Sequence, residues 1–105
     1  MWFVFPQIRG LGSSPTAVRF AISGMEEARA YLEHPVLGPR LRECTGIVVG
    51  VEGRSVEEIF GYPDDLKFHS SMTLFAKAAE EAGVFGEALG KYVGGRMDPG
   101  TLERI

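Results

Sequence analysis

The fold is decided by residues 37–51, LGPRLRECTGIVVGV. Five apolar side chains in this stretch are separated by steps of three and four positions, the spacing that places residues on one face of an α-helix. They are Leu37, Leu41, Cys44, Val48 and Val51. Ile47–Val49 is β-branched and lies between Gly46 and Gly50, so a short strand is the alternative. The long stripe outweighs this local propensity and predicts a helix of about four turns.

Helix signals continue towards the N-terminus. Ser14-Pro15 places a capping residue before a proline, as is typical of the first helical position. Ser23–Glu26 fits a capping box, and Met25, Ala28 and Leu32 follow at helical spacing. Pro35 should end that helix just after His34. Two further helices are therefore expected before residue 37.

Four more helical segments follow towards the C-terminus. Ser55–Glu58 is a second capping box, for a short helix that ends near Gly61. A helix opened by Pro63-Asp64-Asp65 carries an apolar stripe, and the next helix stops at Gly94-Gly95. Asp98-Pro99 begins a last turn through Leu102. The stripe residues are Phe68, Met72, Phe75 and Ala79, followed in the next helix by Val84, Phe85, Ala88, Leu89 and Tyr92. The sequence predicts an all-α fold, a single-domain bundle of five or six short helices over residues 1–105.

Composition excludes several classes of protein. The chain has 105 residues, which suits one domain, and its net charge of -3 is unlike the basic surface of a nucleic-acid binder. No apolar run reaches the roughly 18 residues that a membrane span needs. The single cysteine, Cys44, indicates a reducing compartment, so we expect a cytoplasmic protein. One cysteine and two dispersed histidines do not form a metal site, and no cofactor is expected.

Three stretches carry a family resemblance. They are WFVFPQIRGLG at residues 2–12, ARAYL with HPVLGPRL within residues 28–41, and IFGYPDDLK with SSMTLF within residues 59–75. Together they resemble the bacterial domain-of-unknown-function family 1810, some members of which are labelled calpastatin-like. The resemblance implies an all-helical domain without established activity. The label would imply a protease inhibitor, but calpastatin is long and disordered and this chain is compact.

The start of the chain departs from that family. Members usually carry one or two helices before the stretch that here begins at Trp2, so residues 1–105 are expected to form a helical domain that lacks the first helix or helices. Trp2–Phe5 holds four large apolar side chains, which should be packed inside the domain or against a second copy. A missing helix would uncover apolar surface, and we therefore expect a homodimer.

The helix that begins at Asp64 carries the strongest candidates for catalysis. Asp65 and His69 are one turn apart, a spacing that would let the carboxylate orient the imidazole as a general acid or base. Alternatively, Asp64 or Asp65 could act on a glycosidic bond, with Lys67 on the flank beside them. A fainter likeness of this segment to NADAR domains implies chemistry on N-glycosidic linkages. The structural alternative is a capped helix with a surface ion pair.

Candidate ligand-binding residues lie before and after this helix. Arg9-Gly10-Leu11-Gly12-Ser13-Ser14-Pro15 precedes a helix N-terminus, where free N–H groups and Arg9 could hold a phosphate; the alternative is a flexible turn. The stretch lacks the residues of a Walker loop. The remaining candidates could line or close a pocket, or be structural. They are Trp2, Gln7, Tyr62, Ser71 and Arg96.

These candidates support two hypotheses from different classes. The first is a small helical protein that binds a sugar or nucleotide-like ligand and hydrolyses a glycosidic or phosphorylated small molecule. The second is a non-catalytic module for protein interaction or self-association, because the sequence holds no strong catalytic motif.

Overall fold

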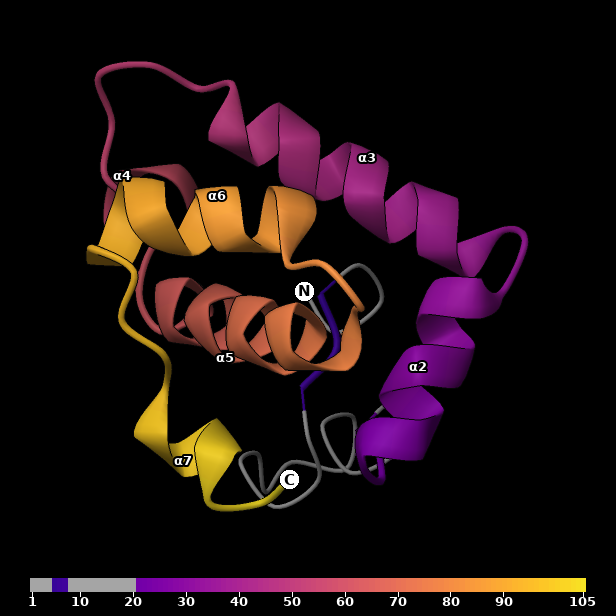
Figure 1. The fold of residues 1–105 in the computed structure, drawn as a ribbon. Coiled ribbons are helices and arrows are strands. Elements are labelled where there is room, and N and C mark those ends of the chain that lie inside the picture. Colours follow the sequence, from indigo (N-terminus) through magenta and orange to yellow (C-terminus); the bar gives the residue numbers. More distant parts are fainter. Residues whose placement is uncertain (1–4, 8–20) are drawn as a thin grey trace.

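The computed structural model describes residues 5–7 and 21–105, and in these residues it forms six helices and no β-strand (Figure 1). The predicted all-α fold is confirmed. The helices are α2 (Met25–Glu33), α3 (Leu37–Val49), α4 (Val56–Phe60), α5 (Asp64–Ala78), α6 (Gly83–Val93) and α7 (Pro99–Leu102). The helix expected after Ser14-Pro15 lies outside the described residues, as do Trp2 and Arg9. None of the helices described is long and apolar enough to cross a membrane.

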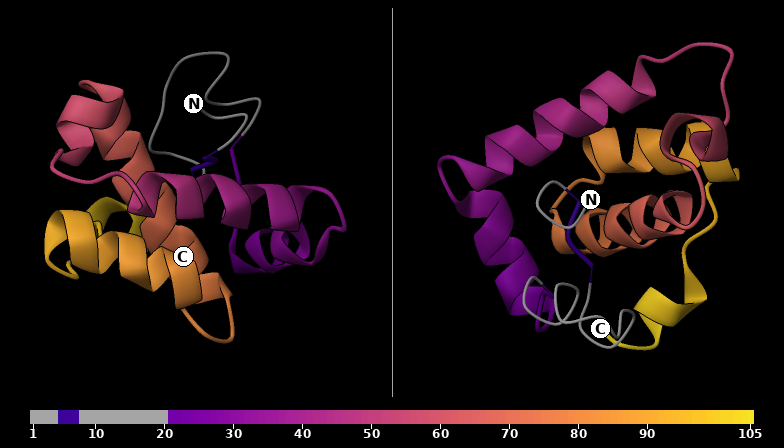
Figure 2. Two further views of the ribbon diagram at one scale, coloured as in Figure 1. Left: turned by 90° about the horizontal axis from the view of Figure 1, so that it is seen from above. Right: turned by 180° about the vertical axis from the view of Figure 1, so that it is seen from behind.

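Helix α5 forms the centre of the molecule. It contacts α2, α4, α6 and α7, while α3 packs across α2 and α6 (Figures 1 and 2). Every residue from Ser70 to Ala76 is buried. The ring of Phe75 lies 5.4 Å from that of Tyr31 on α2 and 5.8 Å from that of Phe85 on α6. The core therefore surrounds α5 rather than lying on one side of it.

Residues 37–49 of the stretch that decided the fold form α3, so the alternative of a short strand at Ile47–Val49 is wrong. Val48 faces the core and is buried, whereas Ile47 points outward and is 65% exposed. At the start of α3, a Cβ added to Gly38 would lie 2.0 Å from the carbonyl oxygen of Leu32. The close approach of α2 and α3 at this turn requires glycine.

One of the two predicted capping boxes is present. The Ser55 hydroxyl accepts from the N–H of Glu58 at 3.2 Å, and the Glu58 carboxylate accepts from the N–H of Ser55 at 2.9 Å. The box at Ser23–Glu26 is wrong. Helix α2 begins after Gly24, so the Ser23 N–H reaches the carboxylate of Glu27 instead, at 3.0 Å, and no side chain caps the helix.

Residues 5–7 pack against the core. Phe5 is buried, and its ring makes edge-to-face contacts with Phe60 at 5.8 Å and Phe68 at 5.0 Å between centroids. The backbone of Gln7 accepts a hydrogen bond of 2.7 Å from the N–H of Ile22. Phe5 therefore packs inside the domain, which is one of the two arrangements expected for the apolar residues near the start of the chain.

Candidate functional site

The first turn of α5 carries a surface ion pair. The Lys67 ammonium lies 3.5 Å from the Asp64 carboxylate, and the Asp64 side chain is 41% exposed. Solvent screens such a pair, which is worth at most about 1 kcal/mol. For these two predicted catalytic residues, the structure has the surface ion pair of the structural alternative, but no side chain of the described residues caps this helix end.

The expected pair between Asp65 and His69 is not formed within the described residues. Nε2 of His69 instead donates a hydrogen bond of 2.8 Å to the carbonyl oxygen of Arg96. The left-handed turn at Gly94 and Gly95 brings this carbonyl back to α5, where it satisfies the ring. The guanidinium of Arg96 itself bonds to the carbonyl of Val93 at 3.0 Å. His69 therefore fastens the end of α6 to α5.

Two polar atoms of α5 are buried without a hydrogen-bond partner: Oδ1 of Asp65 and Oγ of Ser71. Ser71 is completely buried, because α5 is enclosed along this length. Its hydroxyl lies in the core and away from any ligand that enters from solvent. Leaving such a group without a hydrogen bond costs roughly 1–3 kcal/mol.

The other predicted ligand-binding residues do not form one site in the part of the chain that the structure describes. Tyr62 is 76% exposed, whereas Gln7 is buried. Trp2 and Arg9 lie outside the described residues, so the phosphate loop is not described either. Among the predicted residues, the contacts observed are Asp64 with Lys67 and His69 with Arg96.

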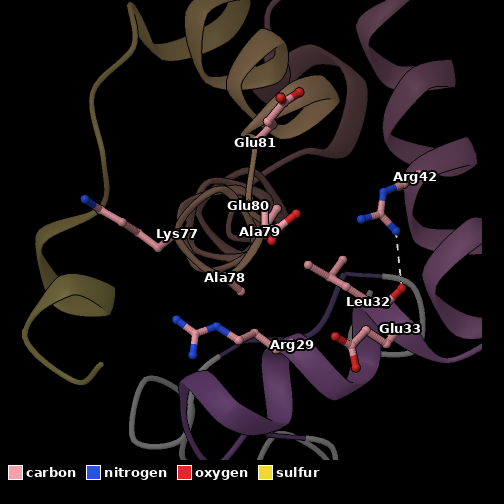
Figure 3. Close-up of a pocket in the computed structure, with 9 residues that line it drawn as sticks. All are labelled: Arg29, Leu32, Glu33, Arg42, Lys77, Ala78, Ala79, Glu80 and Glu81. Carbon is pink, nitrogen blue, oxygen red and sulfur yellow. Dashed lines mark hydrogen bonds between the residues drawn. The ribbon is translucent and has the colours of Figure 1, made fainter.

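A pocket lies elsewhere, between α2, α3 and the C-terminal end of α5 (Figure 3). Its volume is about 770 Å³, which is within the range of small-molecule sites. Three apolar side chains and six charged ones line it, namely Leu32, Ala78 and Ala79, with Arg29, Glu33, Arg42, Lys77, Glu80 and Glu81. None of the catalytic or ligand-binding residues predicted from the sequence lines this pocket in the described part of the chain.

The six charged side chains of the pocket are all exposed. In the described part of the chain, the ion pairs are Lys67 with Asp64 and Lys91 with Glu52, so no two opposite charges of the pocket lie within 4.0 Å of each other. Their charges are hydrated and free to meet a ligand.

Arg42 is the charged side chain that the fold holds most firmly in the pocket. Its Nη1 donates to the carbonyl oxygen of Leu32 at 3.3 Å, and its guanidinium carbon lies 5.9 Å from the centre of the Phe85 ring. The latter geometry is that of a cation–π contact. Leu32 is the residue that Gly38 approaches closely, so the same turn positions α3 and the acceptor for Arg42.

Comparison with known proteins identifies the family. The family model described as a protein of unknown function, DUF1810, matches residues 1–105. The chain belongs to this family. A crystal structure of the conserved hypothetical protein Rv1873 from Mycobacterium tuberculosis has a TM-score of 0.95 and 64% sequence identity, over 97% of this chain and 73% of that chain. No curated protein matches the chain. The family resemblance seen in the sequence is confirmed, and the similar solved structure comes from a bacterium.

Membership of DUF1810 assigns no chemistry to any residue, so the candidate site depends on geometry. The sequence missed the pocket because its charges come from three separate segments. Each of them is typical of the solvated face of a helix or loop. Only the turn between α2 and α3 and the end of α5 bring them together, and no local motif marks that meeting.

Proposed function

We propose that this member of DUF1810 is a binding domain for a small polar molecule, held in the pocket between α2, α3 and the end of α5. The observation that carries the proposal is a concave apolar floor surrounded by six charged side chains that have no ion-pair partner among the described residues. Charged groups in such a place can exchange water for charge-assisted hydrogen bonds to a ligand. The fixed guanidinium of Arg42 lowers the entropy lost when one of those bonds forms.

Amide chemical shifts of the isotope-labelled protein test this proposal. The probes are ribose 5-phosphate, methyl glucoside and dialanine, each titrated separately. Binding of any of them should shift the amides of Leu32, Ala78 and Ala79 in a saturable way. Ala79→Phe, which fills the pocket, should abolish the shifts, and Ala30→Phe on the exposed face of α2 should not. Shifts that saturate elsewhere, or none with any probe, would contradict the proposal.

A second candidate is hydrolysis of a glycosidic bond at the first turns of α5. The observation that favours it is the half-buried carboxylate of Asp65, whose Oδ1 has no hydrogen-bond partner among the described residues to compete with a substrate. Nitrophenyl glycosides provide the assay. Asp65→Asn should abolish turnover, while Asp64→Asn, which removes only the exposed ion pair, should preserve it. Equal turnover by both variants would reject this role for Asp65.

We also propose that the chain forms a homodimer. The supporting observation is that Tyr62, two residues before α5, and Leu66, in the first turn of α5, are 76% and 51% exposed. Burial of such side chains favours association. Sedimentation at micromolar concentration should show a dimer that Leu66→Ser weakens. Ile47→Ser, at a position on α3 that is 65% exposed, serves as the control. A stable monomer of the unmodified chain would reject the proposal.

A further inference from the structure

The charges of the pocket are distributed unequally between its two sides. Helices α2 and α3 supply two arginines and one glutamate, whereas the end of α5 supplies two glutamates and one lysine. In Figure 3, Glu80 points towards Leu32 and Arg42, and Lys77 points to the opposite side of α5. The space between Arg42 and Glu80 is therefore positive on one side and negative on the other.

The end of α5 strengthens the negative side. The helix ends at Ala78, and Ala78, Ala79 and Glu80 line the pocket directly. The last carbonyl groups of a helix carry about half a negative charge, which favours a cation within the final turn. An ammonium group placed there would meet both the helix end and the carboxylate of Glu80.

The positive side is built for a carboxylate. Arg42 is held by the carbonyl of Leu32 and the ring of Phe85, and its guanidinium has N–H donors beyond the one bonded to Leu32. Guanidinium groups bind carboxylates through two parallel hydrogen bonds. Arg29, one turn before Glu33 on α2, also lines the pocket, but in Figure 3 its guanidinium points away from Arg42, so Arg42 is the cation that would meet the carboxylate.

From this arrangement we infer that the ligand is a zwitterion, namely a short peptide with both ends free. Its carboxylate faces Arg42 and its ammonium group faces Glu80 and the end of α5. Two or three residues span at most about 7 to 11 Å, and the volume of the pocket exceeds that of a single amino acid. Leu32, Ala78 and Ala79 offer an apolar floor to its side chains. The inference rests on the proposed function and specifies its ligand.

The charge balance disfavours the alternatives. A phosphorylated sugar would bring about two negative charges to a pocket that already holds three carboxylates, and a polyamine would meet three cations. A peptide with free ends brings one charge of each sign, which matches the balance of three cations and three carboxylates in the pocket. The two ends can be tested separately, because each can be neutralised by a covalent cap.

The test measures the affinity of dialanine by calorimetry against two capped forms, N-acetyl-dialanine and dialanine amide. Each cap should weaken binding at least tenfold. In Arg42→Gln, dialanine and its amide should bind equally, because the partner of the carboxylate is gone. In Glu80→Gln, dialanine and its N-acetyl form should become equal. The controls Arg40→Gln and Glu87→Gln carry the same changes at exposed positions outside the pocket and should keep both preferences.

The outcomes separate this inference from the proposed function. If the capped forms bind as tightly as dialanine, or if only ribose 5-phosphate shifts the pocket amides, the zwitterion is wrong and the binding pocket stands. If no probe shifts those amides, the proposed function itself fails. Arg42→Lys, which keeps the charge, should retain part of the preference for the free carboxylate, and complete loss in a folded Arg42→Lys variant would place the carboxylate elsewhere.

Discussion

The backbone N–H of Asp98 donates a hydrogen bond of 2.9 Å to Oγ1 of Thr73, 25 positions earlier in the chain. The same hydroxyl donates to the carbonyl of His69 at 3.0 Å. Thr73 is fully buried on α5, and Asp98 caps α7 through bonds of 3.0 and 2.7 Å from the N–H and hydroxyl of Thr101. A single hydroxyl group thus links the central helix to the start of the last one.

Thr73→Val should therefore lower the free energy of unfolding by about 1–3 kcal/mol, because the partly buried N–H of Asp98 loses its acceptor. Thr45→Val is the matched control. Thr45 is also fully buried, but its hydroxyl bonds only to the carbonyl of Leu41 in its own helix, so we expect a loss under about 1 kcal/mol. Urea denaturation measures both. Equal losses would show that the link between the helices contributes nothing.

Two glycines of α3 should respond in opposite directions to alanine. In Gly38→Ala, the new Cβ would lie 2.0 Å from a backbone oxygen of α2, so the helices must separate at a cost of about 3 kcal/mol or more. In Gly46→Ala, the Cβ meets nothing within 4 Å, and the variant should gain about 0.5–1 kcal/mol from helix propensity. Thermal unfolding distinguishes them. A Gly38→Ala protein as stable as the unmodified chain would contradict the close packing of α2 and α3.

The neighbouring serines of α5 offer a second contrast. Ser71 has a buried hydroxyl without a partner, so Ser71→Ala should leave the free energy of unfolding unchanged or raise it by up to about 1 kcal/mol. The Ser70 hydroxyl bonds to the carbonyl of Leu66 and the carboxylate of Asp98, and Ser70→Ala should lower stability by about 1 kcal/mol. Chemical denaturation at neutral pH compares the two. Destabilisation by Ser71→Ala would mean that its hydroxyl is bonded in solution.

The capping box of α4 predicts one component of the acid response. Two hydrogen bonds with Ser55 hold the pKa of Glu58 below its ordinary value of 4.5. The larger effect comes from the backbone of Ser55 and the smaller from its side chain. A carboxyl group with a lowered pKa stabilises the folded state fully above the unfolded value, and this contribution is lost as pH falls through the folded value.

Melting temperatures compared at about pH 5 and about pH 3 should therefore differ less in Glu58→Gln than in the unmodified chain. Glu57→Gln is the control, since the Glu57 side chain makes no hydrogen bond in the described part of the chain. An identical acid response in both variants would mean that the cap does not contribute.

Much of the fold follows from local signals in the sequence. Ser55, Gly94 and Asp98 mark helix ends because each provides a cap or a left-handed residue that the backbone needs there. The stripe through Leu41 and Val48 correctly predicts α3, whose periodicity extends over more residues than the β-branched run. These local signals do not predict where each helix lies relative to the others.

The candidate site shows this limit. Ser71 is a candidate pocket residue by sequence, yet Ser70, Ser71 and Thr73 are all buried, because short hydroxyl side chains can bond to their own helix or remain in the core. His69 lies one turn from Asp65 but finds its partner 27 positions later, at Arg96. A hydrogen bond between residues so far apart in the sequence depends on how the helices pack together. The pocket depends on the same packing, so neither could be predicted from local patterns.

The enclosure of α5 on several sides affects how the molecule can come apart. Helices α2, α4, α6 and α7, which come from both halves of the chain, all pack on α5. Removing any one of them would expose part of the α5 surface to solvent. Among the described helices, these four thus all depend on contacts with α5. Proteolytic cleavage in a connecting loop should therefore yield either an intact, nicked particle or complete digestion, without a trimmed fragment that persists.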